Sequence, residues 1–310
     1  SQKYTQTNIT MNITEFIVLG FGNIGQWQSL LFFVFLVVYI VAMAGNILIV
    51  TLVAGDQNLH TTMYFFLGNL SCLETCHISN IVPKMMAGLL TDKNTISFTS
   101  CFVQFFFFSY LMATECYLLS AMSYDRYLAI CKPLHYTTSM TTRICIQLAA
   151  SSWISSLIAG FILLSVMLQL TFCGPNEIDH YFCDTYPIMK LSCSDTTELV
   201  DFILALMVII VPLCMVITSY IYIISTVLKI PSAQGRKKAF STCSSHLTVV
   251  VLFYSTTLFT YARPKAMYAY NSNKLVSVLY TVIVPLLNPL IYCLRNKEIN
   301  SNIWKSSLSS

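Results

Sequence analysis

Long apolar runs alternate with short polar segments along the whole chain. Seven of these runs reach about 20 residues or more, which is the length that a helix needs to cross the hydrocarbon layer of a bilayer. A helix suits this environment because its backbone hydrogen bonds close within the segment. The pattern therefore predicts an all-α membrane protein, a seven-transmembrane helix bundle. The predicted spans are residues 28–54, 62–89, 98–131, 144–170, 199–228, 239–262 and 274–293.

The composition agrees with a membrane protein. Apolar residues make up 56% of the 310 residues and charged residues only 10%, whereas soluble domains carry about 25% charged residues. Basic residues gather at the span ends and loops of one side, which is therefore predicted to be cytosolic, with the amino terminus outside. These residues are Arg126, Lys132, Arg143, Lys229, Arg236, Lys237, Lys238, Arg295, Lys297 and Lys305.

This topology divides the chain into three parts. We expect an extracellular tail over 1–27, a membrane domain over 28–293 and a cytoplasmic tail over 294–310. A short amphipathic helix could follow the seventh span on the inner leaflet. Asn8 and Asn12 each begin an Asn-x-Thr pattern in the external tail, so both are candidate glycosylation sites.

Two carboxylic acids, Glu74 and Glu115, fall in the middle of predicted spans. A carboxylate at that depth is costly unless it is protonated, paired or bound to a cation. We therefore expect both side chains to face an interior polar site rather than lipid. His77 and His246 are interpreted as helix-packing or hydrogen-bonding groups rather than metal ligands.

The adjacent charges Asp125 and Arg126 lie near the cytosolic end of the third span. A charge near the bilayer boundary can reach the headgroups, so position alone allows either an interfacial anchor or a switch. As a switch, the ion pair would hold Arg126 in the resting state, and an outward swing of the sixth helix would free it to face the cytosol. Two classes of function then fit the chain: a ligand-gated receptor, and a transporter or channel that uses the interior carboxylates.

Four longer motifs occur in order on the predicted helices. They are LHTTMYFFLGNLS (59–71), MSYDRYLAICKPLHY (122–136), KAFSTCSSHL (238–247) and PLLNPLIYCLRNKE (285–298). Together they resemble the olfactory receptors of vertebrates, which are rhodopsin-like G-protein-coupled receptors, and the resemblance extends from the first helix to just past the seventh. The family usually has Pro where Thr62 stands, Ala where Ser123 stands and Gly where Ser255 stands.

The resemblance implies an odorant receptor, and the absence of carboxylates and bases from the expected pocket lining predicts a small, mostly apolar, uncharged volatile ligand. It also implies a stimulatory heterotrimeric G protein of the olfactory type, which raises cAMP, and a place in the plasma membrane, in the cilia of olfactory sensory neurons. An accessory trafficking factor and membrane lipid are further expected partners. We expect no enzyme activity, no nucleic-acid partner and no cofactor apart from a sodium ion in the interior site. The Asp125-Arg126-Tyr127 and Asn288-Pro289 sequences are accounted for only by the receptor, which is therefore favoured over the transporter.

The expected ligand site lies in the outer half of the bundle. Helical spacing puts Phe108, Ser109 and Met112 on one face of the third helix, and the resemblance aligns this face with residues of three other helices. The lining is apolar with a few hydroxyl groups, and Tyr261 is the expected polar contact. The remaining members of the set are Leu204, Ala205, Val208, Tyr254, Thr257, Leu258, Val278 and Thr281.

Resemblance and position assign further roles. The coupling and activation set is Asp125, Arg126, Tyr127, Tyr220, Lys237, Lys238, Asn288, Pro289 and Tyr292. The interior polar or sodium site comprises Asn46, Glu74, Glu115 and Asn288, where a proton shared by the carboxylates is the alternative to sodium. The family pattern pairs Cys101 with Cys183 and Cys173 with Cys193, one of the three pairings that four outer cysteines allow.

Overall fold

The computed structural model describes most of the chain. It covers residues 14–22, 25–91, 94–173, 175–193, 203–261 and 272–295. The side chains of Asn58, Lys238, Thr242, Tyr261, Ser272, Asn273 and residues 292–295 are outside the description. The candidate glycosylation sites Asn8 and Asn12, and the tail after Arg295, also lie outside the described residues.

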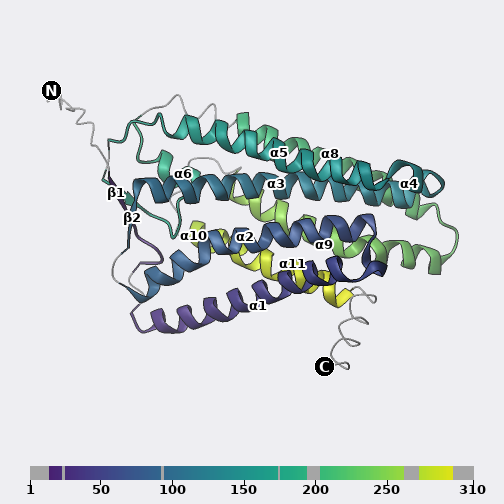
Figure 1. The fold of residues 1–310 in the computed structure, drawn as a ribbon, viewed down its shortest axis with the longest axis horizontal. Helices are drawn as coiled ribbons and strands as arrows, with labels where there is room; N and C mark the ends of the chain where they lie inside the picture. The colour runs from purple at the N-terminus through teal and green to yellow at the C-terminus, as the bar shows by residue number, and fades with distance from the viewer. Residues whose placement is uncertain are drawn as a thin grey trace.

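Seven helical segments of the described chain run along the long axis of the molecule (Figure 1). Five of them are single helices: α1 (Trp27–Gly55), α2 (Thr62–Leu90), α3 (Phe98–Cys131), α5 (Thr142–Met167) and α9 (Ala233–Tyr261). The fifth segment along the chain begins at Ile203 and continues through η2 (Leu206–Ile210) and α8 (Val211–Leu228). The seventh consists of α10 (Ser272–Val278), η4 (Leu279–Ile283) and α11 (Val284–Arg295). Short helical turns occupy the connections: η1 (Gln57–Leu59), α4 (Pro133–Ser139) and α6 (Thr185–Met189).

Six of these segments are long and apolar enough to cross a membrane, and α2 is the exception among the described helices. It has 29 residues, which is length enough, but it carries polar groups such as Glu74 and His77. Both of these side chains are buried, and α2 packs between α1 and α3. The prediction of a seven-helix membrane bundle is confirmed, and packing rather than hydropathy identifies its second member.

The helix boundaries differ from the apolar runs where a helix continues past the lipid. α9 begins at Ala233 rather than at residue 239, because Ala, Gln, Arg and Lys are good helix formers although most of them are polar. α5 ends at Met167 rather than at residue 170. An apolar run therefore marks a membrane span but does not fix the residues at which its helix begins and ends.

Two helices contain a wide π-helical turn immediately before a proline. η2 is followed by Val211 and Pro212, and η4 by Val284 and Pro285. A proline has no N–H to donate, and its ring crowds the carbonyl group four residues earlier, so a wider turn relieves both problems. Such turns are frequent at functional sites. Here they contain two of the expected ligand contacts, Val208 in η2 and Thr281 in η4.

A small sheet at one end of the bundle was not predicted. Strand β1 (Glu15–Val18) pairs antiparallel with β2 (Thr95–Ser97) and parallel with β3 (Glu177–Ile178). Phe16 is fully buried and lies against the rings of Phe98 and Phe172. Part of the expected polar tail is thus a strand that joins three distant segments of the chain.

The two ends of the bundle carry different sets of candidate residues. One end holds the sheet and both disulfides, and we call it the disulfide end. The opposite end holds α4 and the C-terminal half of α3, and we call it the Arg126 end (Figure 1). The candidate ligand site lies nearer the disulfide end, and the candidate activation residues Asp125, Arg126 and Tyr127 lie at the Arg126 end.

Candidate functional site

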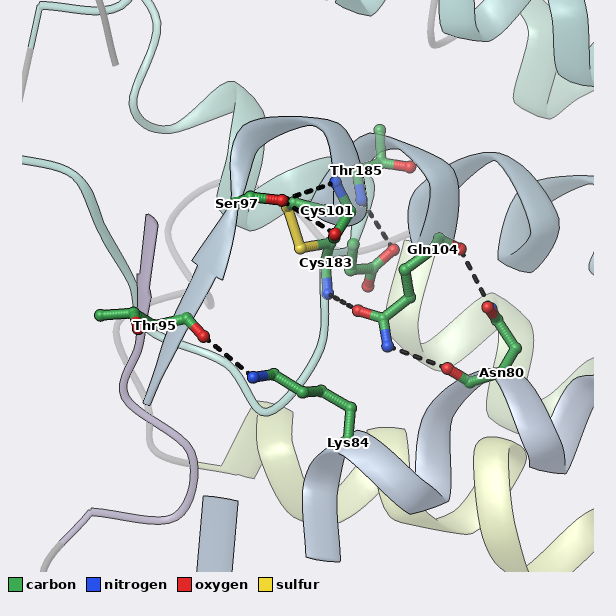
Figure 2. Close-up of a disulfide and its surroundings, with 10 residues drawn as sticks. Asn80, Lys84, Thr95, Ser97, Cys101, Gln104, Cys183 and Thr185 are labelled. Atoms are coloured by element: carbon green, nitrogen blue, oxygen red, sulfur yellow. Dashed lines mark hydrogen bonds between the residues drawn. A yellow bond between two sulfur atoms is a disulfide. The ribbon is translucent and has the colours of Figure 1, made fainter. Parts of the chain in front are cut away.

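A cross-linked loop closes the disulfide end of the bundle. The structure pairs Cys101 with Cys183 and Cys173 with Cys193, which is the pairing expected from the resemblance. Figure 2 shows that Gln104 adds a polar bridge beside the first disulfide: its side chain accepts from the Cys183 amide at 3.0 Å and donates to the Asn80 carbonyl oxygen at 2.9 Å. The loop is therefore fixed to both α3 and α2.

The segment just before Cys183, residues 180–182, packs into the end of the bundle against α3 and the seventh segment. These contacts were not predicted from the sequence. The Tyr181 hydroxyl lies 2.8 Å from the Thr281 hydroxyl, and the Phe182 ring lies 4.8 Å from that of Phe108. His180 Nε2 lies 3.1 Å from the Ser277 hydroxyl. The signal was available, because three aromatic or imidazole side chains directly precede a cysteine that must reach the third helix.

His180 is held in its neutral form. Burial lowers the pKa of His180 to about 3, and the positive charge of Lys274 acts in the same direction. Lys274 itself donates to Asp179 at 2.6 Å and lowers the pKa of that carboxyl group. The loop segment thus combines an ion pair at its exposed edge with an uncharged imidazole inside.

Most of the expected ligand residues belong to the apolar core, which runs through the whole bundle. Phe108, Met112 and Tyr254 are buried members of it, together with the loop residues Tyr181 and Phe182. Four others pack against the cluster with partial exposure: Ala205, Val208, Leu258 and Val278. Leu204 and Ser109 are half-buried, and the Ser109 hydroxyl donates to its own helix. Thr281 is buried and bonded to Tyr181.

Thr257 is the hydroxyl in this set that lacks a partner. Its Oγ1 is buried and has no hydrogen bond within the described residues, whereas the Tyr254 hydroxyl donates to the Cys116 carbonyl oxygen at 3.2 Å. A buried hydroxyl without a partner is costly. Tyr261, the polar contact expected from the sequence, ends α9, and its side chain lies outside the description.

A separate apolar hollow of 270 Å³ opens between the outer ends of α3 and α5. It contains none of the expected ligand residues. Phe102, Phe106 and Leu164 are among the side chains that line it.

The interior carboxylates gather as expected, with two changes in membership. Asn288 donates to Glu74, and Glu74, Glu115 and His77 have ligand atoms within 4.8 Å of one another. The Asn46 side-chain amide donates instead to the carbonyl oxygens of Ala42, in its own helix, and of Pro285. The second bond joins α1 to α11. The interpretation of His77 as a packing residue is incomplete: its ring meets Phe108 edge-on, but neither nitrogen has a hydrogen-bond partner in the described part of the chain.

The Asp125–Arg126 pair is buried at the Arg126 end. Arg126 Nε donates to Asp125 Oδ2 at 3.0 Å, and its terminal nitrogen also contacts that oxygen. The other carboxylate oxygen accepts from Thr62 and from Tyr136, each at 2.8 Å, and these two hydroxyl groups contact each other. Thr62, which stands where Pro is usual, therefore adds a hydrogen bond to the ion pair.

A second contact joins the fifth helix to the sixth at the same end. The Tyr220 hydroxyl lies 2.6 Å from His246 Nδ1, with the two rings stacked. His246 is thus a hydrogen-bonding group, as interpreted from the sequence, although its link to Tyr220 was missed. Tyr127 packs against Tyr222, and Lys237 is exposed.

The other activation candidates are only partly described. Pro289 lies inside α11, close to Gly45 of α1, where an added Cβ would come within 3.2 Å of the ring. The side chains of Lys238 and Tyr292 lie outside the description.

A multi-pass helical bundle with a cross-linked loop over an apolar interior and a buried ion pair at its opposite end defines a membrane receptor. The family model described as "Olfactory receptor" matches residues 35–309. Human "Olfactory receptor 6Y1" is 53% identical over 94% of this chain and 91% of its own length. Mouse "Olfactory receptor 6B9" is 50% identical over 96% and 95%, and rat "Olfactory receptor 226" is 47% identical over 94% and 91%.

The chain belongs to the olfactory receptor family. It is a multi-pass G-protein-coupled receptor without enzymatic activity, its ligand is an odorant, and its signalling partner is a G protein. The transporter alternative is thereby set aside.

Proposed function

We propose that this receptor recognises a small, mostly apolar, uncharged volatile odorant with one hydrogen-bonding oxygen. The observation that carries the proposal is the buried Thr257 hydroxyl, which has no hydrogen-bond partner among the described residues and lies one turn of α9 from the apolar core residues Phe253 and Tyr254. The expected lining set contains no carboxylate and no base, so an unpaired ligand charge would be costly to bury. An oxygen atom on the ligand would form a hydrogen bond with the Thr257 hydroxyl, and the apolar part of the ligand would pack against the apolar side chains of the site.

The ligand site proposed here lies beneath the loop that carries Tyr181 and Phe182. It adjoins the π-helical turns η2 and η4, whose wide geometry gives a ligand room to change the helix packing there. An odorant that binds one arrangement of these helices more tightly than another would shift the population towards it. That shift is the proposed first step of signalling.

The second step takes place at the Arg126 end and couples to a stimulatory G protein of the olfactory type, which raises cAMP. In the structure Arg126 is paired with Asp125, and we assign this arrangement to the resting receptor. Separation of α9 from α3 would expose Arg126 to the G protein. Tyr220, Tyr127, Lys237 and the Asn288-Pro289 bend support the exposed arrangement, together with Lys238 and Tyr292.

The receptor is proposed to lie in the plasma membrane of cilia with its disulfide end outside. Disulfides form in oxidising compartments, and basic residues such as Lys132, Arg143 and Lys229 cluster at the opposite end, which favours a cytosolic position for it. In this orientation 1–27 is the external tail, 28–293 the membrane domain and 294–310 the cytoplasmic tail. Glycosylation at Asn8 and Asn12 and the help of a trafficking factor are part of the same proposal.

The interior site of Glu74, Glu115 and Asn288 is proposed to hold a sodium ion or a shared proton. Glu74 is already oriented by Asn288, and oxygen ligands suit a hard cation such as sodium. Asn46 belongs to this site only as a support that ties α1 to α11.

A panel of volatile compounds tested for cAMP responses in cells provides the direct test. We expect neutral alcohols, ketones or esters to activate the receptor, and Arg126→Ala to abolish the response while surface expression and ligand binding remain measurable. Arg143→Ala, an exposed charge at the same end, is the matched control and should signal normally. Normal signalling by Arg126→Ala would contradict the proposed coupling role. Activation only by charged amines or dicarboxylates would contradict the proposed ligand.

Thr257→Val tests the polar contact. The substitution keeps the shape and removes the hydroxyl, so potency for an oxygenated odorant should fall by up to about tenfold, the equivalent of one neutral hydrogen bond. Potency for a hydrocarbon analogue should not fall. Thr256→Val is the matched control, because that hydroxyl bonds only to its own helix. Equal losses for both ligands would remove Thr257 from the ligand site, and Tyr261→Phe would then be the next variant to compare.

A further inference from the structure

Glu74 and His77 lie three residues apart on α2, so both side chains project from one face of the helix. Glu115 faces them from α3. One nitrogen or oxygen atom from each residue lies within 4.8 Å of the others, and the closest recorded approach to the imidazole is 4.0 Å, between His77 Nδ1 and Glu115 Oε2. The three side chains therefore form a compact cluster in the interior of the bundle.

The cluster has free ligand atoms. Glu74 Oε2, Glu115 Oε1 and both nitrogens of His77 are buried and have no hydrogen-bond partner among the described residues. His77 is 1% exposed and Glu74 is 0% exposed. Buried polar atoms are almost always satisfied by a partner, an ordered water or an ion, so four such atoms in one cluster are candidate ligands for a water or an ion.

The charges favour a divalent ion. Two carboxylates buried side by side carry two negative charges when ionised, and the described residues provide no Lys or Arg salt bridge to either of them. A divalent cation would neutralise the pair, whereas a monovalent cation would leave one charge uncompensated. Removing an unbalanced charge from water is far more costly than removing a neutral assembly.

The imidazole identifies the class of metal. Hard cations such as sodium and calcium prefer oxygen ligands only, while zinc and its neighbours among the transition metals bind imidazole nitrogen well. Zinc binds both histidine nitrogen and carboxylate oxygen, and with three protein ligands it keeps a water in the fourth position. A glutamate and a histidine at positions i and i+3 on one helix, facing a carboxylate from the next, is also how helix bundles build metal sites.

We propose that Glu74, His77 and Glu115 bind a divalent transition-metal ion of the zinc type. Asn288 donates to Glu74 Oε1 and leaves Oε2 for the metal. The four ligands of a zinc ion lie about 3.3–3.6 Å from one another, so small side-chain rotations would close the present spacing. The ion joins α2 to α3 directly and to α11 through Asn288. This proposal differs from a sodium site because the imidazole of His77 is a ligand that favours a transition metal over sodium.

Zinc binding can be measured without an odorant. Full-length receptor would be purified in lipid nanodiscs, with the exposed His60 and His135 replaced by Gln to remove surface sites, and stripped with a chelator. We expect micromolar zinc to bind with a stoichiometry of one and to raise the unfolding temperature in a saturable way. His77→Gln should weaken zinc binding at least about tenfold while the response to sodium chloride persists, because both carboxylates remain.

An equal zinc response in His77→Gln would overturn the proposal, as would the absence of stoichiometric zinc binding. If His77→Gln does not fold, X-ray absorption of the zinc-loaded parent decides. One imidazole nitrogen together with oxygen ligands supports the site, and an oxygen-only or sulfur-containing shell contradicts it. Because none of these readouts uses odorant or G protein, their failure would leave the proposed signalling function untouched.

Discussion

The disulfide end and the Arg126 end of the bundle are held together by different kinds of contact. At the disulfide end, two covalent cross-links, a three-stranded sheet and the Gln104 bridge fix the loop to α2 and α3. At the Arg126 end the contacts between helices include hydrogen bonds from Thr62 and Tyr136 to Asp125 and a hydrogen bond between Tyr220 and His246. Hydrogen bonds exchange readily with water and with a partner protein, whereas disulfides do not.

This difference suggests how one molecule can both hold a ligand and respond to it. A rigid end keeps the loop over the ligand site without a large loss of entropy on binding. If an end held by exchangeable polar contacts has two arrangements of similar free energy, a ligand that prefers one of them shifts the balance towards it. The experiments that follow weaken one end at a time and compare the consequences.

Loss of the covalent link at the disulfide end should have the largest effect. Cys101→Ser removes a cross-link between residues 82 positions apart, and the loss of such a link typically costs about 2–5 kcal/mol. We expect the amount of receptor at the cell surface, measured by flow cytometry, to fall at least about tenfold. Cys72→Ser, at a free exposed cysteine of α2, is the matched control. Normal surface levels and signalling in Cys101→Ser would mean that this end does not depend on its disulfide.

Acid should also weaken the disulfide end, through His180. Its folded-state pKa of about 3 lies below the usual value of about 6.5, so the stabilisation is complete above pH 6.5 and is lost as the pH falls towards 3. Between pH 7 and pH 5 this amounts to about 2 kcal/mol. The groups that face the imidazole are Ser277, Lys274, Asp179 and the rings of Tyr181 and Phe182.

Heat unfolding of purified receptor at the two pH values provides the measurement. His180→Gln should reduce the acid-induced drop in unfolding temperature, while His135→Gln, at an exposed site, should keep it. An unchanged drop in His180→Gln would show that other groups cause the acid sensitivity.

A smaller effect is expected from one hydrogen bond at the Arg126 end. Thr62→Val removes the bond to Asp125 and so destabilises the paired arrangement by about 0.5–1.5 kcal/mol. Basal cAMP production should rise by about twofold to tenfold without loss of surface receptor. Thr75→Val on the same helix is the control, because that hydroxyl bonds to its own helix at Ser71. Lower or unchanged basal activity in Thr62→Val would show that Thr62 does not hold the resting state.

The sequence predicts those parts of the molecule that the bilayer or a local motif dictates. The seven spans follow from the exclusion of unsatisfied backbone groups from lipid, and the burial of Glu74 and Glu115 follows from the cost of a charge at that depth. The Asp125–Arg126 contact follows from adjacency on one helix. In each case a single segment carries enough information.

Contacts between distant short segments were not predictable in this way. Strand β1 has four residues and exists because β2 and β3 meet it, so no local pattern marks it. The Tyr220–His246 bond and the His77 cluster depend on the rotation of neighbouring helices about their axes, which an apolar run does not specify. The loop residue Tyr181 reaches Thr281 only because the disulfide at Cys183 draws the loop inward.

The most direct test of the difference between the two ends is a pair of distance measurements in one receptor preparation, with and without an activating odorant and G protein. Spin labels at the exposed positions Leu134 and Phe240 would report on the Arg126 end, and labels at Glu177 and Leu275 on the disulfide end. We predict a new, longer distance for the first pair on activation and an unchanged distance for the second. A change confined to the disulfide-end pair, or no change in either pair under conditions that produce cAMP, would contradict the account.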